Sequence, residues 1–171
     1  PEPILGWPQV YKERGQGGFM DVVVHPEFSI NRWLYLSYGK ANADGSEGTT
    51  TVVRGRLEGN RVVNVQEIFE SKAWGDNNNH FSGRMAFDLD NYLFLAVGDR
   101  MVTPDLLEEH PSQSLKNHMG AFVRLHDDGR VPSDNPFVGK SGALPEIWSY
   151  GHRNMQGLTV DPETGTVWAN E

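Results

Sequence analysis

Hydrophobic and polar residues alternate along this chain in short runs, and this spacing is typical of strands. The runs are bounded by Gly, Asn, Asp and Pro, and no long stretch has the three- and four-residue apolar spacing of an amphipathic helix. A short helix is predicted over residues 104–109, continuing brokenly through 112–117 because Pro111 interrupts it. The pattern therefore predicts an all-β fold.

Three stretches share one arrangement, in which a strand leads through a turn with an acidic residue or His-Pro into a second strand. They cover residues 21–37, 85–97 and 158–168. Their turn positions are His25, Asp88 and Asp161, which recur about every 60 to 75 residues and indicate repeated supersecondary units. Repeated hairpins favour a β-propeller, whose four-stranded blades surround a central channel. At this spacing, the 171 residues hold about two to three blades.

A propeller typically needs about four to eight blades to bury the blade faces, so this length predicts part of a ring. The chain starts at Pro1 without an initiator Met and stops at Glu171 within a strand-like run. We expect residues 1–171 to form a partial β-propeller domain, truncated at both ends. The alternative is an open partial propeller that is stabilised by self-association.

Composition narrows the class of partner. Hydrophobic residues make up 37% of the chain, with five Trp, eight Phe and five Tyr, which argues against disorder. The net charge of −8 disfavours nucleic acid and anionic membranes as partners, and a neutral substrate is the easier fit. No run reaches the length of a membrane-spanning helix, and the absence of cysteine excludes disulfides and thiolate metal sites.

The densest group of binding side chains lies between two strand-like runs, residues 147–150 and 158–160. Here His152, Arg153, Asn154 and Gln156 stand between glycines, as on a loop that a rigid scaffold supports. The Arg guanidinium is a rigid fork of donors that keeps its charge, which suits it to a carbonyl or a developing oxyanion. The alternative is a polar turn with a structural Arg.

Four ordered motifs together resemble the soluble quinoprotein sugar dehydrogenases of the glucose/sorbosone dehydrogenase family, which use pyrroloquinoline quinone (PQQ). They span most of the chain and are the Gly-Gln-Gly-Gly run that ends in His-Pro-Glu-Phe (15–28), His-Phe-Ser-Gly-Arg (80–84), the Asp-Gly run that ends in Asp-Asn-Pro-Phe (128–137) and Gly-His-Arg-Asn-Met-Gln-Gly (151–157). The resemblance implies a six-bladed propeller of which this chain holds the N-terminal part.

The resemblance also assigns roles to single residues. Oxidation of an aldose at C1 requires a base near neutral pKa and a hydride acceptor that side chains cannot supply, so the acceptor must be a cofactor. His80 falls on the family's proton-abstracting histidine, Arg153 on the arginine that approaches cofactor and substrate, and Asn154 on an amide that contacts the quinone. Gln16 falls on a glutamine near the sugar hydroxyls. The residues alone favour a surface or hydrogen-bonded turn histidine at position 80, and the alternative for Gln16 is a polar residue in a glycine turn.

Other residues depart from the family pattern or stay open. Asn79 stands where some members have an acid before the histidine, and Ala121 where the family usually has Lys. Asp99 follows a strand and suits metal binding, side-chain orientation or a turn. His25 is expected to be structural, and no histidine spacing fits zinc. The family's calcium ligands are expected beyond Glu171, so this piece alone is expected to bind PQQ poorly and to be inactive.

Two functions of different class remain. The first is a quinoprotein aldose dehydrogenase that uses PQQ and calcium, passes electrons to an external acceptor, and works in the periplasm or outside the cell, as is the habit of the family. The second is a non-catalytic propeller module that binds a protein or glycan. A hydrolytic propeller is a third interpretation, suggested only by the run Asn77-Asn78-Asn79.

Overall fold

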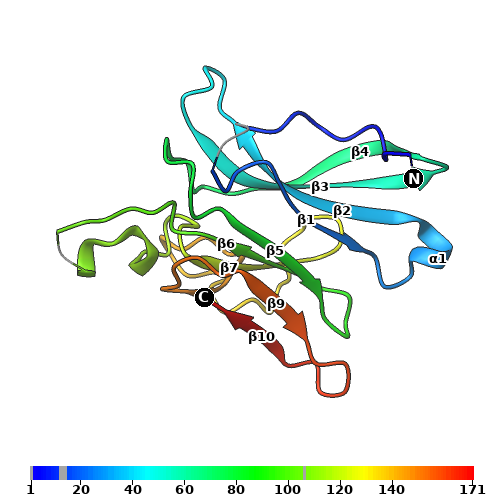
Figure 1. Ribbon diagram of the computed structural model, residues 1–171. Coiled ribbons are helices and arrows are strands. Elements are labelled where there is room, and N and C mark those ends of the chain that lie inside the picture. Colours follow the sequence, from blue (N-terminus) through cyan, green and yellow to red (C-terminus); the bar gives the residue numbers. More distant parts are fainter. Residues whose placement is uncertain (1, 12–14, 106) are drawn as a thin grey trace.

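The computed structural model describes residues 2–11, 15–105 and 107–171. Two four-stranded antiparallel sheets and one two-stranded sheet make up most of it (Figure 1). The first sheet contains β1 (Phe19–Val24), β2 (Trp33–Ala41), β3 (Gly48–Glu58) and β4 (Arg61–Glu70) in chain order. The second contains β5 (Ser82–Phe87), β6 (Leu93–Val97), β7 (Ala121–Leu125) and β8 (Ile147–Tyr150), and the third pairs β9 (Gly157–Val160) with β10 (Val167–Asn170).

Each sheet opens with one of the three predicted hairpins. The backbone N–H of His25, Asp88 and Asp161 donates in turn to the carbonyl of Trp33, Tyr92 and Thr166, at 2.9–3.0 Å. A helical turn, α1 (Phe28–Asn31), lies within the first of these connections. The first strands of the sheets also lie next to one another, since β1 packs on β5 and β5 on β9. The fold is therefore a propeller arrangement of two four-stranded blades and the opening hairpin of a third.

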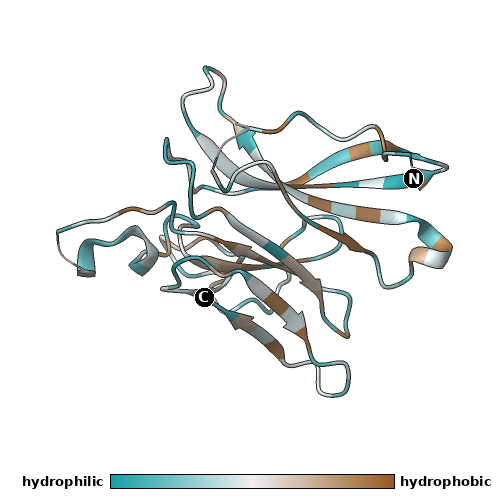
Figure 2. Ribbon diagram, in the orientation of Figure 1, coloured by the Kyte–Doolittle hydropathy of each residue, from teal (hydrophilic) through white to brown (hydrophobic). Residues whose placement is uncertain are grey.

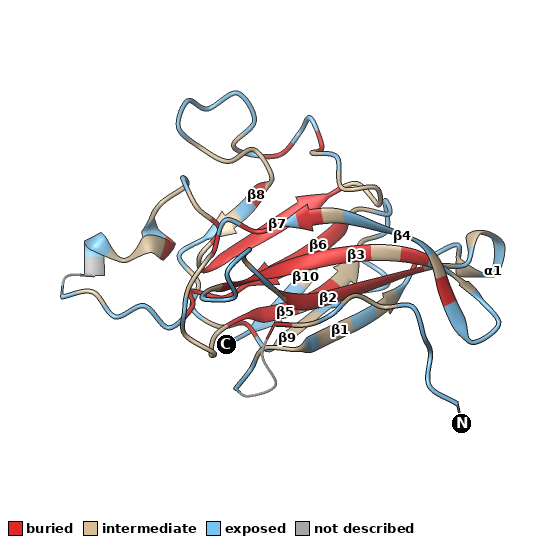
Figure 3. Cartoon of the chain, turned by 90° about the horizontal axis from the view of Figure 1, so that it is seen from above, coloured by how far each residue is buried: buried red, intermediate tan, exposed pale blue. Residues whose placement is uncertain are grey.

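The hydrophobic core lies between the two complete blades. The strands β2, β3, β6 and β7 are buried along most of their length, whereas β10 and the ends of β4 are exposed (Figure 3). Hydropathy alternates along β2, as the period of two requires for a strand, whereas the fully buried β6 is apolar throughout (Figure 2). The core residues come from both blades and include Tyr35, Val52, Phe69, Leu93, Leu95 and Val123. The packing of one blade against the other thus keeps their shared loops in place.

One expectation about the elements was wrong. The helix predicted over 104–109 and 112–117 is replaced by two short 3-10 turns, η1 (Leu107–Glu109) and η2 (Pro111–Gln113). Pro111 has no N–H to continue a helix, and it opens η2 after His110, whose Nδ1 accepts a hydrogen bond from the Ser112 N–H. The strands β3, β4 and β7 were not predicted. Charged residues interrupt the apolar alternation of β3 and β4, and pairing within the sheet determines their structure instead.

No helix within the described ranges is both long and apolar enough to cross a membrane.

Candidate active site

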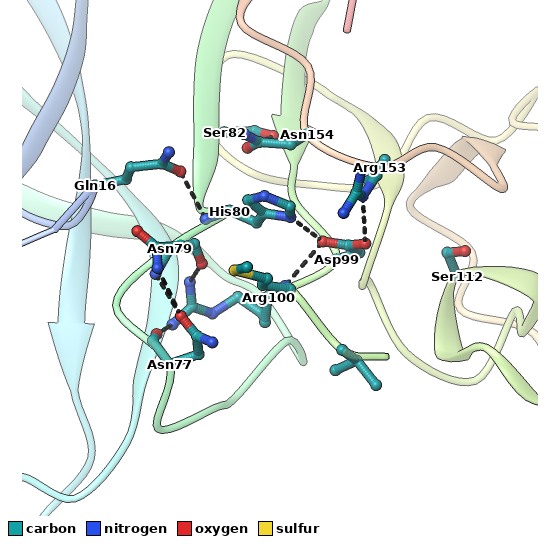
Figure 4. Close-up of polar contacts among 12 residues, drawn as sticks. Gln16, Asn77, Asn79, His80, Ser82, Asp99, Arg100, Ser112, Arg153 and Asn154 are labelled. Carbon is teal, nitrogen blue, oxygen red and sulfur yellow. Dashed lines mark hydrogen bonds and ion pairs between the residues drawn. The ribbon is translucent and has the colours of Figure 1, made fainter. Parts of the chain in front are cut away.

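His80 lies in the loop that leads from the first blade into β5, and both blades hold this loop. In the first blade, Thr50 Oγ1 donates a hydrogen bond to the Phe81 carbonyl of this loop at 2.8 Å. The backbone N–H of His80 donates to Gln16 Oε1 at 2.7 Å (Figure 4). His80 has a φ of +53°, a conformation that non-glycine residues rarely adopt and that is frequent at functional sites. Gly98 lies so close that a Cβ there would be 2.0 Å from the His80 carbonyl oxygen.

Asp99 follows β6 and determines which nitrogen of His80 carries the proton. Its Oδ1 lies 2.7 Å from His80 Nδ1 and also accepts the Met101 N–H at 2.9 Å (Figure 4). A carboxylate accepts only, so the neutral imidazole carries its hydrogen on Nδ1 and leaves the Nε2 lone pair free. His80 Nε2 has no hydrogen-bond partner in the part of the chain that the structure describes. The ring is therefore an oriented base.

The second oxygen of the Asp99 carboxylate faces two further cationic or titratable groups. His110 Nε2 lies 3.5 Å away and Arg153 Nε 3.9 Å away. The Asp99 side chain is 2% exposed, whereas the Arg153 side chain is 67% exposed. A buried carboxylate needs such partners to offset its loss of hydration. The Asp99 N–H also donates to the Arg153 carbonyl at 2.8 Å, which ties the end of β6 to the loop between β8 and β9.

Asn154 lies beside this group and presents an amide donor. Its Oδ1 accepts hydrogen bonds from Ser82 Oγ at 3.3 Å and Gln156 Nε2 at 2.9 Å. These bonds orient the amide, and its Nδ2 has no partner among the described residues. On the other side of the loop, the Arg153 N–H donates to Glu171 Oε2 at 2.8 Å, and His152 Nδ1 contacts Glu171 Oε1 at 2.9 Å. The loop between β8 and β9 is thus held by Ser82 on one side and by Glu171 on the other.

A cavity of about 470 Å³ opens next to Asp99 and Arg153. Its walls come from the segment after β6 and from the β8–β9 loop, and its polar lining residues are Asp99, Thr103, Asp105, His110, Ser112, Gln113, His152 and Arg153. A second hollow of about 240 Å³ is lined in part by Gln16, Ser82 and Gln156. His80 lies between Gln16 and Arg153 (Figure 4). The cavity can hold a polar molecule next to the Asp99 carboxylate and the exposed cation of Arg153, and Asp99 connects it to His80.

The predicted site residues Gln16, His80, Arg153 and Asn154 lie together at one end of the blades. Of the three roles that the sequence allows for Asp99, which are metal binding, orientation and a turn, the geometry supports orientation of His80. The cavity residues His110, Ser112 and Gln113 were not predicted. Their one sequence signal is that they follow Gly-Asp at the end of a buried strand. In the described ranges, no group of three or more His, Asp or Glu could hold a metal ion.

Comparison with known proteins identifies the family. The family model described as "Glucose / Sorbosone dehydrogenase" matches residues 1–171. The chain is 41% identical over 171 residues to "Aldose sugar dehydrogenase YliI" of Escherichia coli (strain K12), and the match covers 99% of this chain and 44% of that protein. The chain thus spans less than half the length of that relative.

Solved structures agree with this match. The crystal structure of the soluble aldose sugar dehydrogenase from Escherichia coli in the apo-form superposes with a TM-score of 0.90 at 39% identity, over 100% of this chain and 48% of that one. The PQQ-bound form of the aldose sugar dehydrogenase from Streptomyces coelicolor superposes with a TM-score of 0.75 at 25% identity, over 93% and 43% of the two chains. The chain therefore belongs to the glucose/sorbosone dehydrogenase family.

Proposed function

We propose that the protein carrying this sequence oxidises an aldose at C1 to the lactone and uses PQQ as its cofactor. The observation that carries this proposal is the contact of His80 Nδ1 with the buried Asp99 carboxylate at 2.7 Å, which leaves Nε2 free as a base. Abstraction of a sugar hydroxyl proton requires such a base. The membership of the chain in a family of sugar dehydrogenases supports the same reaction.

His80 and Asp99 act as a pair in this proposal. His80 Nε2 takes the proton from the C1 hydroxyl, and the ring becomes an imidazolium. Asp99 keeps the other proton on Nδ1 and stabilises the positive charge as it forms, because the two groups are 2.7 Å apart and the carboxylate is buried. Gln16 holds the His80 backbone through its Oε1, and its Nε2 remains able to donate to a sugar hydroxyl.

The donor set beside His80 fits a quinone that carries carboxylates. The guanidinium nitrogens of Arg153 have no contact other than the long one to Asp99, and Asn154 Nδ2 has no partner among the described residues. A cation and an amide N–H are the groups that bind quinone carbonyls and carboxylates. When bound there, PQQ would supply the acceptor for the hydride that leaves C1. Arg153 orients the ligand and stabilises negative charge on oxygen.

We place the remaining parts of the enzyme outside residues 1–171, because the chain spans 44% of its relative. These are calcium, its ligands and the further cations that three carboxylates require. We expect residues 1–171 alone to be inactive. The proposed compartment is the periplasm or the cell exterior, and an external acceptor takes the electrons from the reduced quinone.

Dye-coupled oxidation of aldoses tests the proposal. The longest chain that carries this sequence is assayed with calcium, with and without added PQQ, beside His80→Ala. We expect turnover that depends on PQQ, and a fall in kcat of roughly 10²–10⁴-fold in His80→Ala, since a positioned base contributes about that much.

His126→Ala is the control, because His126 lies in the turn after β7 and contacts Tyr92 instead of the site. Its kcat should match that of the wild type. A folded full-length chain that oxidises none of several aldoses would overturn the dehydrogenase and favour a non-catalytic binding module.

A further inference from the structure

Arg100, which follows Asp99, is buried in an unusual way. It is the largest of the fully buried side chains in the described part of the chain and is 1% exposed. No carboxylate among the described residues lies within ion-pair distance of its guanidinium. Burial lowers the pKa of Arg100 to about 10, although the charges of Asp76 and Asp99 partly oppose this. The side chain is therefore a buried cation at neutral pH without an ion-pair partner in the described part of the chain, which is costly unless its donors are used.

The Nη donors of Arg100 bind the loop that carries His80, whereas its buried Nε has no hydrogen-bond partner among the described residues. Nη1 donates to the Asn79 carbonyl at 2.5 Å, while Nη2 donates to the carbonyls of Asn77 and, at 3.4 Å, of Gly75 (Figure 4). The guanidinium carbon lies 3.4 Å from the ring centroid of Phe81, the residue after His80. One side chain thus contacts the loop on both sides of His80, and the Arg100 N–H donates to the His80 carbonyl at 3.2 Å.

The loop needs such contacts because its backbone is strained. His80 and Ser82 have φ values of +53° and +59°, and Arg100 and Met101, on the facing turn, have +58° and +57°. Left-handed conformations of non-glycine residues persist only where the surroundings hold them, at a cost of order 1–3 kcal/mol each. The Arg100 guanidinium binds the carbonyls of Gly75, Asn77 and Asn79, which are every second residue of the loop, and so holds residues 75–79 in one conformation.

We propose that Arg100 is a positioning residue that aims the His80 imidazole at Asp99. The turn after β6 contacts His80 twice: Asp99 binds the ring at Nδ1, and Arg100 binds the backbone that carries the ring. Because the two residues are adjacent, the guanidinium contacts set the distance between the loop and the carboxylate. The proposal rests on the proposed role of His80 as base, and it adds a cation that touches neither sugar nor cofactor.

The test replaces Arg100 in the longest chain that carries this sequence. Arg100→Met keeps most of the buried volume but removes all donors, and Arg100→Lys keeps the charge but cannot reach three carbonyls. The first readout is ¹⁵N NMR of histidine-labelled protein without cofactor, which reports the tautomer of His80. We expect the Nδ1–H tautomer in the wild type, a mixture of both tautomers in Arg100→Met, and an intermediate mixture in Arg100→Lys.

The second readout is turnover. We expect kcat to fall on the order of 10²-fold in Arg100→Met, with a much smaller change in KM and an altered pH profile, because a displaced base slows the chemical step. Arg124→Met is the matched control: Arg124 is 6% exposed, stacks over Tyr92 and pairs with Asp134 away from His80. It should lose stability while its His80 tautomer and pH profile stay as in the wild type.

The outcomes separate the two proposals. If folded Arg100→Met keeps the wild-type tautomer and pH profile, Arg100 is merely structural and the inference is overturned. Should Arg100→Met not fold, a wild-type tautomer in Arg100→Lys overturns it equally. A wild type that shows the expected tautomer but no PQQ-dependent turnover overturns the proposed function alone, because the NMR readout needs no cofactor.

Discussion

The carboxylate of Asp99 is the most constrained group of the candidate site. Its oxygens face His80, His110, Arg153 and the Met101 N–H within 4 Å, and its side chain is 2% exposed. Substitution by Asn keeps the shape but supplies an amide that can donate as well as accept. The Nδ1–H tautomer of His80 is then no longer enforced.

We therefore expect Asp99→Asn to lower kcat by roughly 10²–10⁴-fold, which is the range for loss of an oriented general base, with little change in KM. Steady-state kinetics with PQQ and calcium measures this effect. Asp90→Asn is the matched control, since Asp90 is an exposed residue of the β5–β6 turn, and its kcat should be unchanged. An Asp99→Asn variant as fast as the wild type would contradict the assignment.

Strand β6 joins the core to the site, because it is buried over its whole length and ends just before Asp99. Leu95 at its centre is 0% exposed and belongs to the core cluster that residues of both blades form. We expect Leu95→Ala to lower the free energy of unfolding by about 2–5 kcal/mol through lost burial and a residual cavity. Urea unfolding of the longest chain measures the change.

Leu89→Ala provides the comparison for that experiment. Leu89 lies in the turn before β6 and is 58% exposed, so its replacement should change the free energy of unfolding by less than about 0.5 kcal/mol. If both variants lost the same free energy of unfolding, the burial of Leu95 in β6 would not stabilise the core.

Prediction from sequence succeeded for some elements and failed for others, for identifiable reasons. The opening hairpins of all three sheets were predicted, since their apolar runs and turn residues at His25, Asp88 and Asp161 are local signals. The strands β3 and β4 were missed because their outward positions carry Arg and Glu, whose packing depends on neighbours such as Trp33 under Arg54. The predicted helix after β6 failed because Pro111 has no N–H to continue it, and the segment forms only two 3-10 turns.

Two side chains, the buried His118 and the partly buried Glu146, join the two blades of the molecule. His118 is 0% exposed, accepts the Lys72 N–H at 2.8 Å through Nδ1, and places Nε2 3.0 Å from Glu146 Oε1. Lys72 follows the first blade, whereas Glu146 precedes the last strand of the second. Burial by itself raises the pKa of the Glu146 carboxyl, but the contact with His118 and the charge of Lys72 outweigh it, so the pKa lies below its ordinary 4.5.

This lowered pKa makes the free energy of unfolding depend on pH. A carboxyl whose pKa is depressed by folding stabilises the protein above the ordinary value of 4.5, and this contribution is lost as the pH falls through the lower folded pKa. We expect Glu146→Gln to be less stable than the wild type at neutral pH by roughly 1–3 kcal/mol. It should also lose less stability than the wild type between neutral pH and about pH 3.

Urea unfolding at the two pH values checks this prediction. Glu163→Gln, at an exposed turn residue whose side chain has no partner among the described residues, should follow the wild type at both pH values. If Glu146→Gln and the wild type lost stability in parallel on acidification, Glu146 would not be the group that titrates.

The amino-acid sequence by itself determined that this protein consists of repeated hairpins and that Gln16, His80, Arg153 and Asn154 belong to motifs of one family. Alternation, turn residues and motif order are properties of neighbouring positions, so they are readable along the chain. Only the tertiary structure decided that Asp99 orients His80 and that Arg100 binds the loop before it. These groups are about twenty residues apart and meet because β5 pairs with β6, and such long-range contacts depend on how the blades pack.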